Sequence, residues 1–229
     1  MGRLGRFVLV TRGIAALVAV TVGGCGPTGS TGSGPLSVGS GPQTTQTRAV
    51  SGVSAVRLKT SGAVQIIAAP TTSLTIEAPA DVLPLLTSDV IGGTLELSIK
   101  DGTSVQTSNP IVYRLTVPKL DVIEVDGSGD VTFPDLATGT VRVAIDGSGT
   151  VTLGGTADRQ EVKVSGSGTY TGDRLATKTA KATISGSGDI TLQVSDRLDA
   201  TVSGSGTVRY RGHPALTENV RGSGEVTPG

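Results

Sequence analysis

The sequence predicts an all-β protein folded as a right-handed parallel β-helix-like solenoid of about 18–20 residues per turn. The tripeptide Gly-Ser-Gly occurs six times after residue 120, and successive copies begin 20, 19, 20, 18 and 18 residues apart. Every copy has Val or Ile two residues before its first glycine and Val, Ile or Tyr four residues after it. Like residues at a constant phase indicate repeated units that stack on one another. The 34 glycines and the abundant Ser, Thr and Val favour strands and tight turns over helices.

The chain begins with a segment that has the layout of a secretory signal. Three arginines precede an apolar run from Ile14 to Val22, which is far shorter than the ~20 residues that a membrane-spanning helix needs. The run ends in Val-Gly-Gly-Cys, which resembles a bacterial lipobox. We therefore expect residues 1–24 to be a lipoprotein signal peptide that is removed, and Cys25 to carry the lipid. The alternative is a free thiol close to a cleavage site.

Residues 25–48 consist mainly of Gly, Ser, Thr and Pro and contain very few apolar residues. Such a segment buries too little surface to offset the entropy lost on ordering, so we expect a lipid-anchored flexible linker. With an r.m.s. span of about 26 Å, the linker would hold the folded domain away from the lipid headgroups. Cys25 is the only cysteine, so no disulfide can form within the chain.

The folded domain is expected to cover residues 49–229, and its first half already alternates between apolar and polar residues. The segments expected to form strands are residues 53–60, 63–69, 73–78, 93–99 and 111–117. Gly92-Gly93 and Asp101-Gly102 are typical of hairpin turns. The stretch Leu58–Val64 resembles a degenerate copy of the repeat, with Thr60 in place of the first glycine.

The Gly-Ser-Gly repeat is predicted to be a structural corner. The two apolar positions are six residues apart, so strict alternation places both glycines inward and the serine outward. An inward corner has little room for a Cβ atom, and glycine relieves that crowding. The predicted corner residues are Gly127, Gly129, Gly147, Gly149, Gly166, Gly168, Gly186, Gly188, Gly204, Gly206, Gly222 and Gly224.

A different arrangement would also account for the tripeptide. Gly-Ser-Gly can form a short hairpin loop, in which case the chain would fold as an antiparallel meander or sandwich. The hairpin would bring Asp126 close to Asp130, and two like charges facing each other destabilise a strand pair. The other copies carry no such conflict, so the pattern alone leaves this alternative open.

The repeat and the C-terminal sequence together resemble a known family. The pattern [VI]-x-Gly-Ser-Gly-x-[VIY], with a final turn containing Tyr210, Gly212 and Pro214, is similar to that of the head GIN domain of putative auto-transporter adhesins. The resemblance covers roughly residues 49–226. It implies a β-helix-like fold and a place in the bacterial envelope, and it supplies no catalytic residues.

The residues themselves indicate no catalytic chemistry. No copy of the repeat has the Gly-x-Ser-x-Gly of a nucleophile elbow or the Gly-Lys-Ser/Thr of a phosphate loop. His213 is the only histidine and is expected in a solvated turn. Asp126, Asp130 and Asp146 would lie on adjacent coils, where we expect solvated corner acids and no metal site. We expect no cofactor, and the zero net charge predicts no nucleic-acid partner.

These observations predict a non-enzymatic, surface-exposed lipoprotein whose solenoid is an adhesion or binding module. The expected partners are the membrane, through the lipid anchor on Cys25, and an unidentified envelope or surface ligand. The expected location is the cell envelope, facing away from the cytoplasm. One alternative is a structural or sensory envelope domain, and a second is a β-helix enzyme that acts on polysaccharides.

Overall fold

The computed structural model describes residues 36–229; the predicted signal peptide (residues 1–24) and Cys25 lie outside this part of the chain. Within it the chain forms strands and one short 3-10 turn. We call residues 122–229 the stacked coils and residues 36–121 the N-terminal cap. The strands of the stacked coils are β10 (Val122–Gly127), β11 (Asp130–Gly147), β12 (Thr150–Gly166), β13 (Thr169–Gly186), β14 (Asp189–Gly204), β15 (Thr207–Arg211), β16 (Ala215–Gly222) and β17 (Glu225–Pro228).

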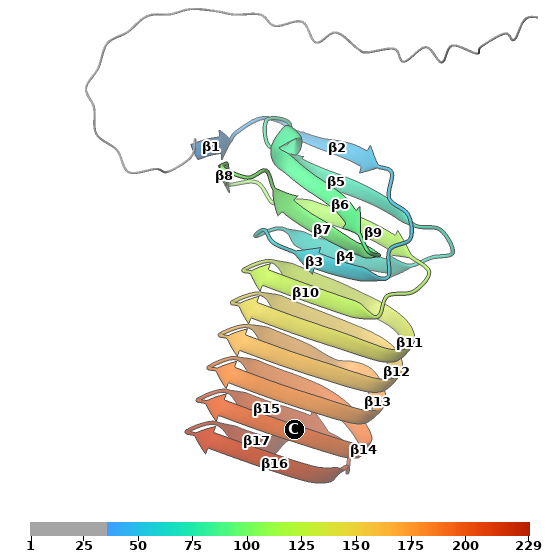
Figure 1. The fold of residues 1–229 in the computed structure, drawn as a ribbon, viewed down its shortest axis with the longest axis vertical. Coiled ribbons are helices and arrows are strands. Elements are labelled where there is room, and N and C mark those ends of the chain that lie inside the picture. The colour runs from blue at the N-terminus through green and yellow to red at the C-terminus, as the bar shows by residue number, and fades with distance from the viewer. Residues whose placement is uncertain (1–35) are drawn as a thin grey trace, which may run out of the picture. The chain divides into compact units, whose positions relative to one another are not determined.

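The stacked coils are a parallel β-solenoid, as predicted (Figure 1). Each strand pairs in parallel with the equivalent strand one coil away, and the corner glycines pair with one another: Gly127 with Gly147, Gly147 with Gly166, and Gly166 with Gly186. The repeat interval of the sequence is therefore the length of one coil. The antiparallel meander is wrong for this region, because the strands before and after each Gly-Ser-Gly pair with other coils and not with each other.

Each coil is flattened into two strand segments, which build two sheets. Sheet A contains the segments that lead into the corners, namely residues 122–127, 140–147, 159–166, 179–186, 197–204 and 215–222. Sheet B contains the segments that leave the corners, namely residues 130–133, 150–153, 169–172, 189–193, 207–211 and 225–228. The chain returns from sheet B to sheet A at the opposite edge, which we call the bend.

The core lies between the two sheets and consists of columns of stacked side chains. One column holds Val125, Ile145, Val164, Ile184 and Val202, all with 0% exposure. A facing column holds Val131, Val151, Tyr170, Ile190 and Val208, also fully buried. Because each side chain packs on its equivalent in the next coil, β-branched residues with few rotamers fill these columns well.

The N-terminal cap has a less regular architecture. Its elements are β1 (Leu36–Gly39), β2 (Gln43–Arg48), β3 (Ala55–Leu58), β4 (Ala63–Ala68), β5 (Ser73–Pro79), the 3-10 turn η1 (Leu83–Leu85), β6 (Leu86–Ile91), β7 (Thr94–Ile99), β8 (Ser104–Thr107) and β9 (Val112–Val117). Strands β3 and β4 continue the solenoid below β10 and β11, and β7 and β9 form the next parallel layer. Strands β6, β5 and β2 are antiparallel and close this end.

The predicted degenerate copy of the repeat is confirmed. Leu58 pairs with Val125, and Ala63 pairs with Asp130, so residues 60–62 turn the same corner as Gly127–Gly129. Thr60 therefore occupies the position of the first glycine. Its side chain is buried, and its hydroxyl has no hydrogen-bond partner among the described residues.

The prediction of a flexible linker over residues 25–48 is wrong for its last part. Strand β1 pairs with β8, and β2 pairs with β5 from Gln43 to Arg48, so the folded domain begins before residue 49. The guanidinium group of Arg48 donates to the carbonyl oxygens of Leu83 and Leu86. Polar residues can form this strand because β2 lies at the edge of the sheet, where its backbone hydrogen bonds need little apolar burial.

The last coil carries an acidic residue in an interior column. Glu218 pairs with Ala200, which is buried, and lies between the exposed apolar residues Leu216 and Val220. Within the described chain, β16 pairs on one side only. A charge at an inward position of an edge strand opposes pairing with another edge, because pairing would bury that charge.

Candidate binding surfaces

The twelve predicted corner glycines lie in stacked, hydrogen-bonded corners. The serine N–H of each corner donates to the carbonyl oxygen of the first glycine one coil earlier; Ser148 to Gly127 and Ser167 to Gly147 are both 2.9 Å. The residue after each second glycine bonds in the same way, as in Thr150 N–H to Gly129 at 3.1 Å. The parallel ladder thus continues around the corner.

This ladder explains why the first glycines cannot be replaced easily. They have φ between 111° and 131°, which L-residues with a side chain rarely adopt. A Cβ atom on Gly147 would lie 2.5 Å from the carbonyl oxygen of Gly127. These first glycines are not inward as predicted but partly exposed, because the positive φ interrupts the alternation of the strand.

The second glycines do point toward the interior. Gly149 is buried, and a Cβ atom there would lie 2.6 Å from the carbonyl oxygen of Gly129 and 2.6 Å from a methyl group of Val125. All six serines between the glycines are exposed, as predicted: Ser128, Ser148, Ser167, Ser187, Ser205 and Ser223. The corner is therefore a joint between coils, and its chemistry resides in the backbone.

The outer face of sheet B is an array of threonines. Thr132, Thr152, Thr171 and Thr191 stand in register on four successive coils. A second column contains Asp130, Thr150, Thr169, Asp189, Thr207 and Glu225. Neighbouring coils are ~4.8 Å apart, and alternate residues of a strand are ~6.7 Å apart. The β-branched side chains are stiff, so the hydroxyl and methyl groups form a preordered, nearly flat surface.

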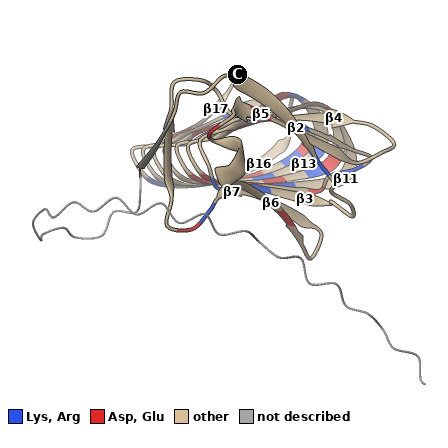
Figure 2. Cartoon of the chain, turned by 90° about the horizontal axis from the view of Figure 1, so that it is seen from above, with Lys and Arg blue, Asp and Glu red and all other residues tan. Residues whose placement is uncertain are grey.

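The outer face of sheet A carries charges of alternating sign instead. Arg142, Glu161, Lys181 and Asp199 occupy one column on successive coils. Figure 2, which looks along the stack, shows charged segments gathered mainly on this side of the coils. Arg159 and Arg142 both bond to Glu161 and together hold the pKa of its carboxyl group below the usual value. The charges of this face are largely satisfied by one another.

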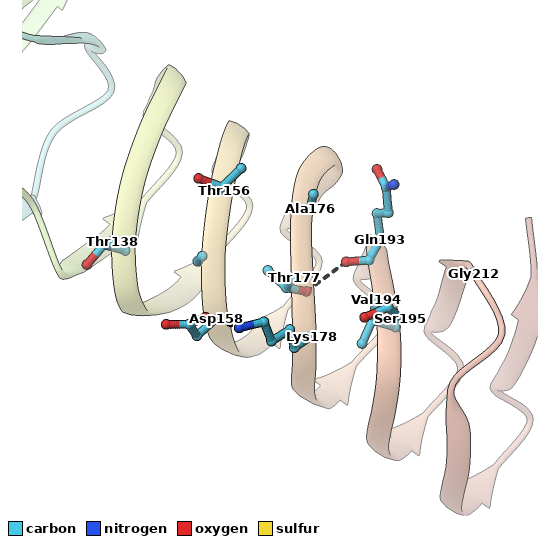
Figure 3. Close-up of a pocket in the computed structure, with 11 residues that line it drawn as sticks. Thr138, Thr156, Asp158, Ala176, Thr177, Lys178, Gln193, Val194, Ser195 and Gly212 are labelled. Atoms are coloured by element: carbon cyan, nitrogen blue, oxygen red, sulfur yellow. Dashed lines mark hydrogen bonds and ion pairs between the residues drawn. The ribbon is translucent and has the colours of Figure 1, made fainter.

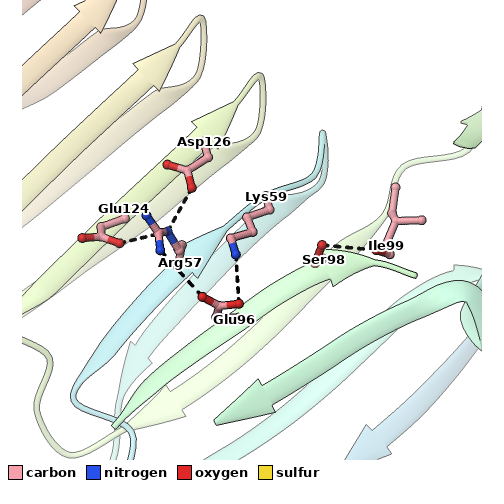
Figure 4. Close-up of polar contacts among 7 residues, drawn as sticks. All are labelled: Arg57, Lys59, Glu96, Ser98, Ile99, Glu124 and Asp126. Carbon is pink, nitrogen blue, oxygen red and sulfur yellow. Dashed lines mark hydrogen bonds and ion pairs between the residues drawn. The ribbon is translucent and has the colours of Figure 1, made fainter. Parts of the chain in front are cut away.

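The same alternation continues into the cap around Arg57 (Figure 4). Its guanidinium group lies 2.9 Å from Asp126, 3.1 Å from Glu124 and 3.7 Å from Glu96. Asp126 is the main cause of the raised pKa of Arg57. Asp126 is therefore an ion-pair partner, and no group of three potential metal ligands occurs among the described residues.

A groove of about 530 Å³ runs along the bend (Figure 3). Ala157, Thr177 and Val194 are buried residues of its lining, and Thr156, Gln193 and Ser195 are exposed ones. Asp158 and Lys178 form an ion pair of 2.8 Å at its rim, and this pairing raises the pKa of Lys178.

The groove lies where a long coil meets a shorter one. In β13, residues 173–175 have no partners in β14, because Gly172 pairs with Leu192 and the next pair is Ala176 with Gln193. The coil that ends at Gly204 has 18 residues, and the coil that ends at Gly186 has 20. The change of interval in the sequence was the signal for this groove, but an interval does not say which edge of the coil loses residues.

A buried polar network lies beneath the groove. Gln160 is fully buried; its amide N–H donates to the Thr177 hydroxyl at 2.7 Å, and its amide oxygen accepts from the Tyr170 hydroxyl at 2.9 Å. Thr177 donates in turn to the carbonyl oxygen of Gln193 at 2.7 Å. Burial raises the pKa of Tyr170 far above its ordinary value. The sequence did not reveal this network, because Gln160 occupies a column that is apolar in the neighbouring coils.

The remaining predicted residues are not brought together. His213 is exposed in the turn before β16. Cys25 lies outside the described residues. No helix in residues 36–229 is both long and apolar enough to cross a membrane.

Comparison with known proteins gives a family and a fold. Residues 53–214 match the family described as "Putative auto-transporter adhesin, head GIN domain". None of the curated proteins matches the chain. The crystal structure of a putative adhesin from Bacteroides fragilis is 24% identical, with a TM-score of 0.70 over 83% of this chain and 99% of that one. A putative lipid binding protein from Parabacteroides distasonis is 19% identical, with a TM-score of 0.53 over 85% of this chain and 100% of that one.

Proposed function

The chain belongs to the family of putative auto-transporter adhesins with a head GIN domain, and from this premise we propose that it is a lipid-anchored adhesion module of the cell envelope. The observation that carries the proposal is the threonine array on sheet B. It is a large, preordered face whose hydroxyl groups are not engaged in a charge ladder like that of sheet A. Such a face suits contact with an extended surface better than enclosure of a small substrate.

The anchor would come from Cys25. The Val-Gly-Gly-Cys sequence supports lipidation there, and β1 begins at Leu36, only 11 residues later. An extended chain of this length reaches about 40 Å at most. Because β1 belongs to the N-terminal cap, the anchor would hold the cap near the bilayer and leave the stacked coils to project from it.

The test of the anchor is metabolic labelling with a tagged fatty acid. Wild-type protein should take up the label, and Cys25→Ser should not. Equal labelling of both proteins would contradict lipidation at this residue.

The test of adhesion is capture of isolated envelope and cell-surface material by the mature chain immobilised on beads. Thr171→Lys, on the array, should reduce capture at least tenfold. Thr183→Lys is the matched control, because Thr183 faces outward from the same strand, β13, but on sheet A. Absence of specific capture by the wild type would favour the alternative of a structural or sensory envelope domain.

A further inference from the structure

We propose that the groove at the bend binds a linear, uncharged glycan that lies along the solenoid axis. The inference rests on the proposed adhesion function and names the ligand class for one part of the surface. Gln193, the last residue of its sheet B segment, lines the groove, so the groove continues the face that carries the threonine array.

The lining of the groove has both kinds of surface that a sugar needs. Ala157, Ala176 and Val194 are small apolar residues that can contact the C–H face of a sugar ring. Thr156, Gln193 and Ser195 supply hydroxyl and amide groups at the sides. Ligand sites commonly combine an apolar lining with a few polar groups, and a volume of about 530 Å³ lies within their usual range.

The ion pair at the rim can exchange partners at little cost. The side chains of Asp158 and Lys178 are 66% and 67% exposed, and exposed pairs of this kind contribute little to stability. The carboxylate accepts hydrogen bonds and the ammonium group donates them, so two adjacent sugar hydroxyl groups can bridge the pair.

The charge near the rim favours an uncharged glycan over an acidic one. Asp196 follows Ser195, accepts a hydrogen bond from its hydroxyl, and acts on Lys178 strongly enough to raise the lysine pKa further. Lys178 is thus flanked by two carboxylates, Asp158 and Asp196. An acidic polymer would meet a net negative rim.

The shape of the groove favours a chain over a single sugar. The lining comes from β11, β12, β13 and β14 and extends to Gly212. With coils ~4.8 Å apart, four successive strands span about 14 Å along the axis. An extended peptide fits less well, because strands β12, β13 and β14 pair with neighbours on both sides and leave no backbone edge at the groove.

The experiment is calorimetric titration of the full chain, purified in detergent, with four probes: cellohexaose, chitohexaose, maltohexaose and, as the acidic control, an oligogalacturonate. At least one uncharged probe should bind. Ala176→Trp, which fills the groove from an exposed position, should weaken that binding at least tenfold, and Asp158→Asn should weaken it severalfold. Ser187→Trp adds the same bulk at the opposite edge and should change nothing; thermal melts confirm that the variants fold.

The proposal is overturned if no uncharged probe binds, if the oligogalacturonate binds more tightly, or if Ala176→Trp binds as well as the wild type. The bead-capture assay keeps this result separate from the proposed function. Capture that persists in Ala176→Trp would refute the groove and leave adhesion standing. Oligosaccharide binding without capture of any envelope material would refute adhesion and leave the groove standing.

Discussion

The stacked coils and the N-terminal cap are built from the same parallel layers, but they differ in how the chain connects those layers. In residues 122–217 each strand pairs with the strand one coil later, so sequence order and spatial order agree. In the cap, β3 and β4 come first in the sequence yet lie between β10–β11 and the later strands β7 and β9. Residues 100–111 connect β7 to β9 without a Gly-Ser-Gly corner.

The comparison shows where the glycine requirement comes from. A Cβ atom on Gly147 would collide with Gly127, whereas a Cβ atom on Gly127 would meet no atom within 4 Å. The corner beside Gly127 is the one at Thr60, which has a side chain and no positive φ. Part of the requirement is therefore imposed by a neighbouring corner of the same shape, and it weakens where the stack meets the cap.

The largest effect should come from a charge placed inside the stack. Ile184 is fully buried between Val164 and Val202, so Ile184→Asp should lower the free energy of unfolding by about 4 kcal/mol. Val220 occupies the same column in the last coil and is 38% exposed. Val220→Asp should therefore cost about 1 kcal/mol. Chemical denaturation of both variants checks the difference, and equal losses would contradict the assignment of the column.

The next effect separates backbone strain from stacking. Gly127 and Gly147 have nearly equal φ values of 131° and 129°. Gly127→Ala should cost about 1–2 kcal/mol from strain alone, and Gly147→Ala about 3 kcal/mol, because its methyl group also meets the neighbouring corner. Urea unfolding measures both. If the two variants lose the same stability, the neighbouring corner contributes nothing.

A smaller effect distinguishes the two buried tyrosines. Tyr170, in the stack, donates to Gln160, whereas the buried hydroxyl of Tyr113, in the cap, has no partner among the described residues. Tyr170→Phe should cost about 1–2 kcal/mol because it leaves a buried amide oxygen without its donor. Tyr113→Phe should change stability by less than about 0.5 kcal/mol or increase it. A larger loss in Tyr113→Phe than in Tyr170→Phe would contradict this description of the two sites.

Both tyrosines also predict a decrease of stability in alkali. Burial raises the pKa of each phenol in the folded state, so the folded protein keeps it neutral while the unfolded chain ionises above about pH 10. Stability should therefore be constant below that pH and fall as the pH rises above it. Melting temperatures between pH 8 and pH 11 test this, and the double Phe variant should show a shallower decrease.

The sequence was sufficient for the regular half of the fold. The interval, the apolar columns and the exposed serines each follow from residues that contact their own equivalents one coil away. The corner at Thr60 was also recognisable, because Leu58 and Gly62 keep their phase relative to the repeat. The cap could not be predicted in the same way, since the pairing of β2 with β5 and the position of β7 beside β3 are non-local and leave no periodic signal.

The candidate surfaces were predictable only in part. An outward face rich in Thr and Ser follows from alternation, but the partial exposure of the first glycines does not, because alternation fails where φ becomes positive. The groove depends on which three residues of β13 lack partners, and the Gln160 network depends on one polar residue in an apolar column. Both are properties of the packed structure.

The central claim is that Gly-Ser-Gly is a joint between coils and not a chemical site. Equilibrium urea unfolding of Gly186→Val and Ser167→Ala, beside the wild type, tests it most directly. A side chain on Gly186 would meet the carbonyl oxygen of Gly166 and require a forbidden backbone angle, so the account predicts a loss of about 3 kcal/mol. Ser167 is exposed, so Ser167→Ala should stay within about 0.5 kcal/mol of the wild type. Equal losses in the two variants would contradict the claim.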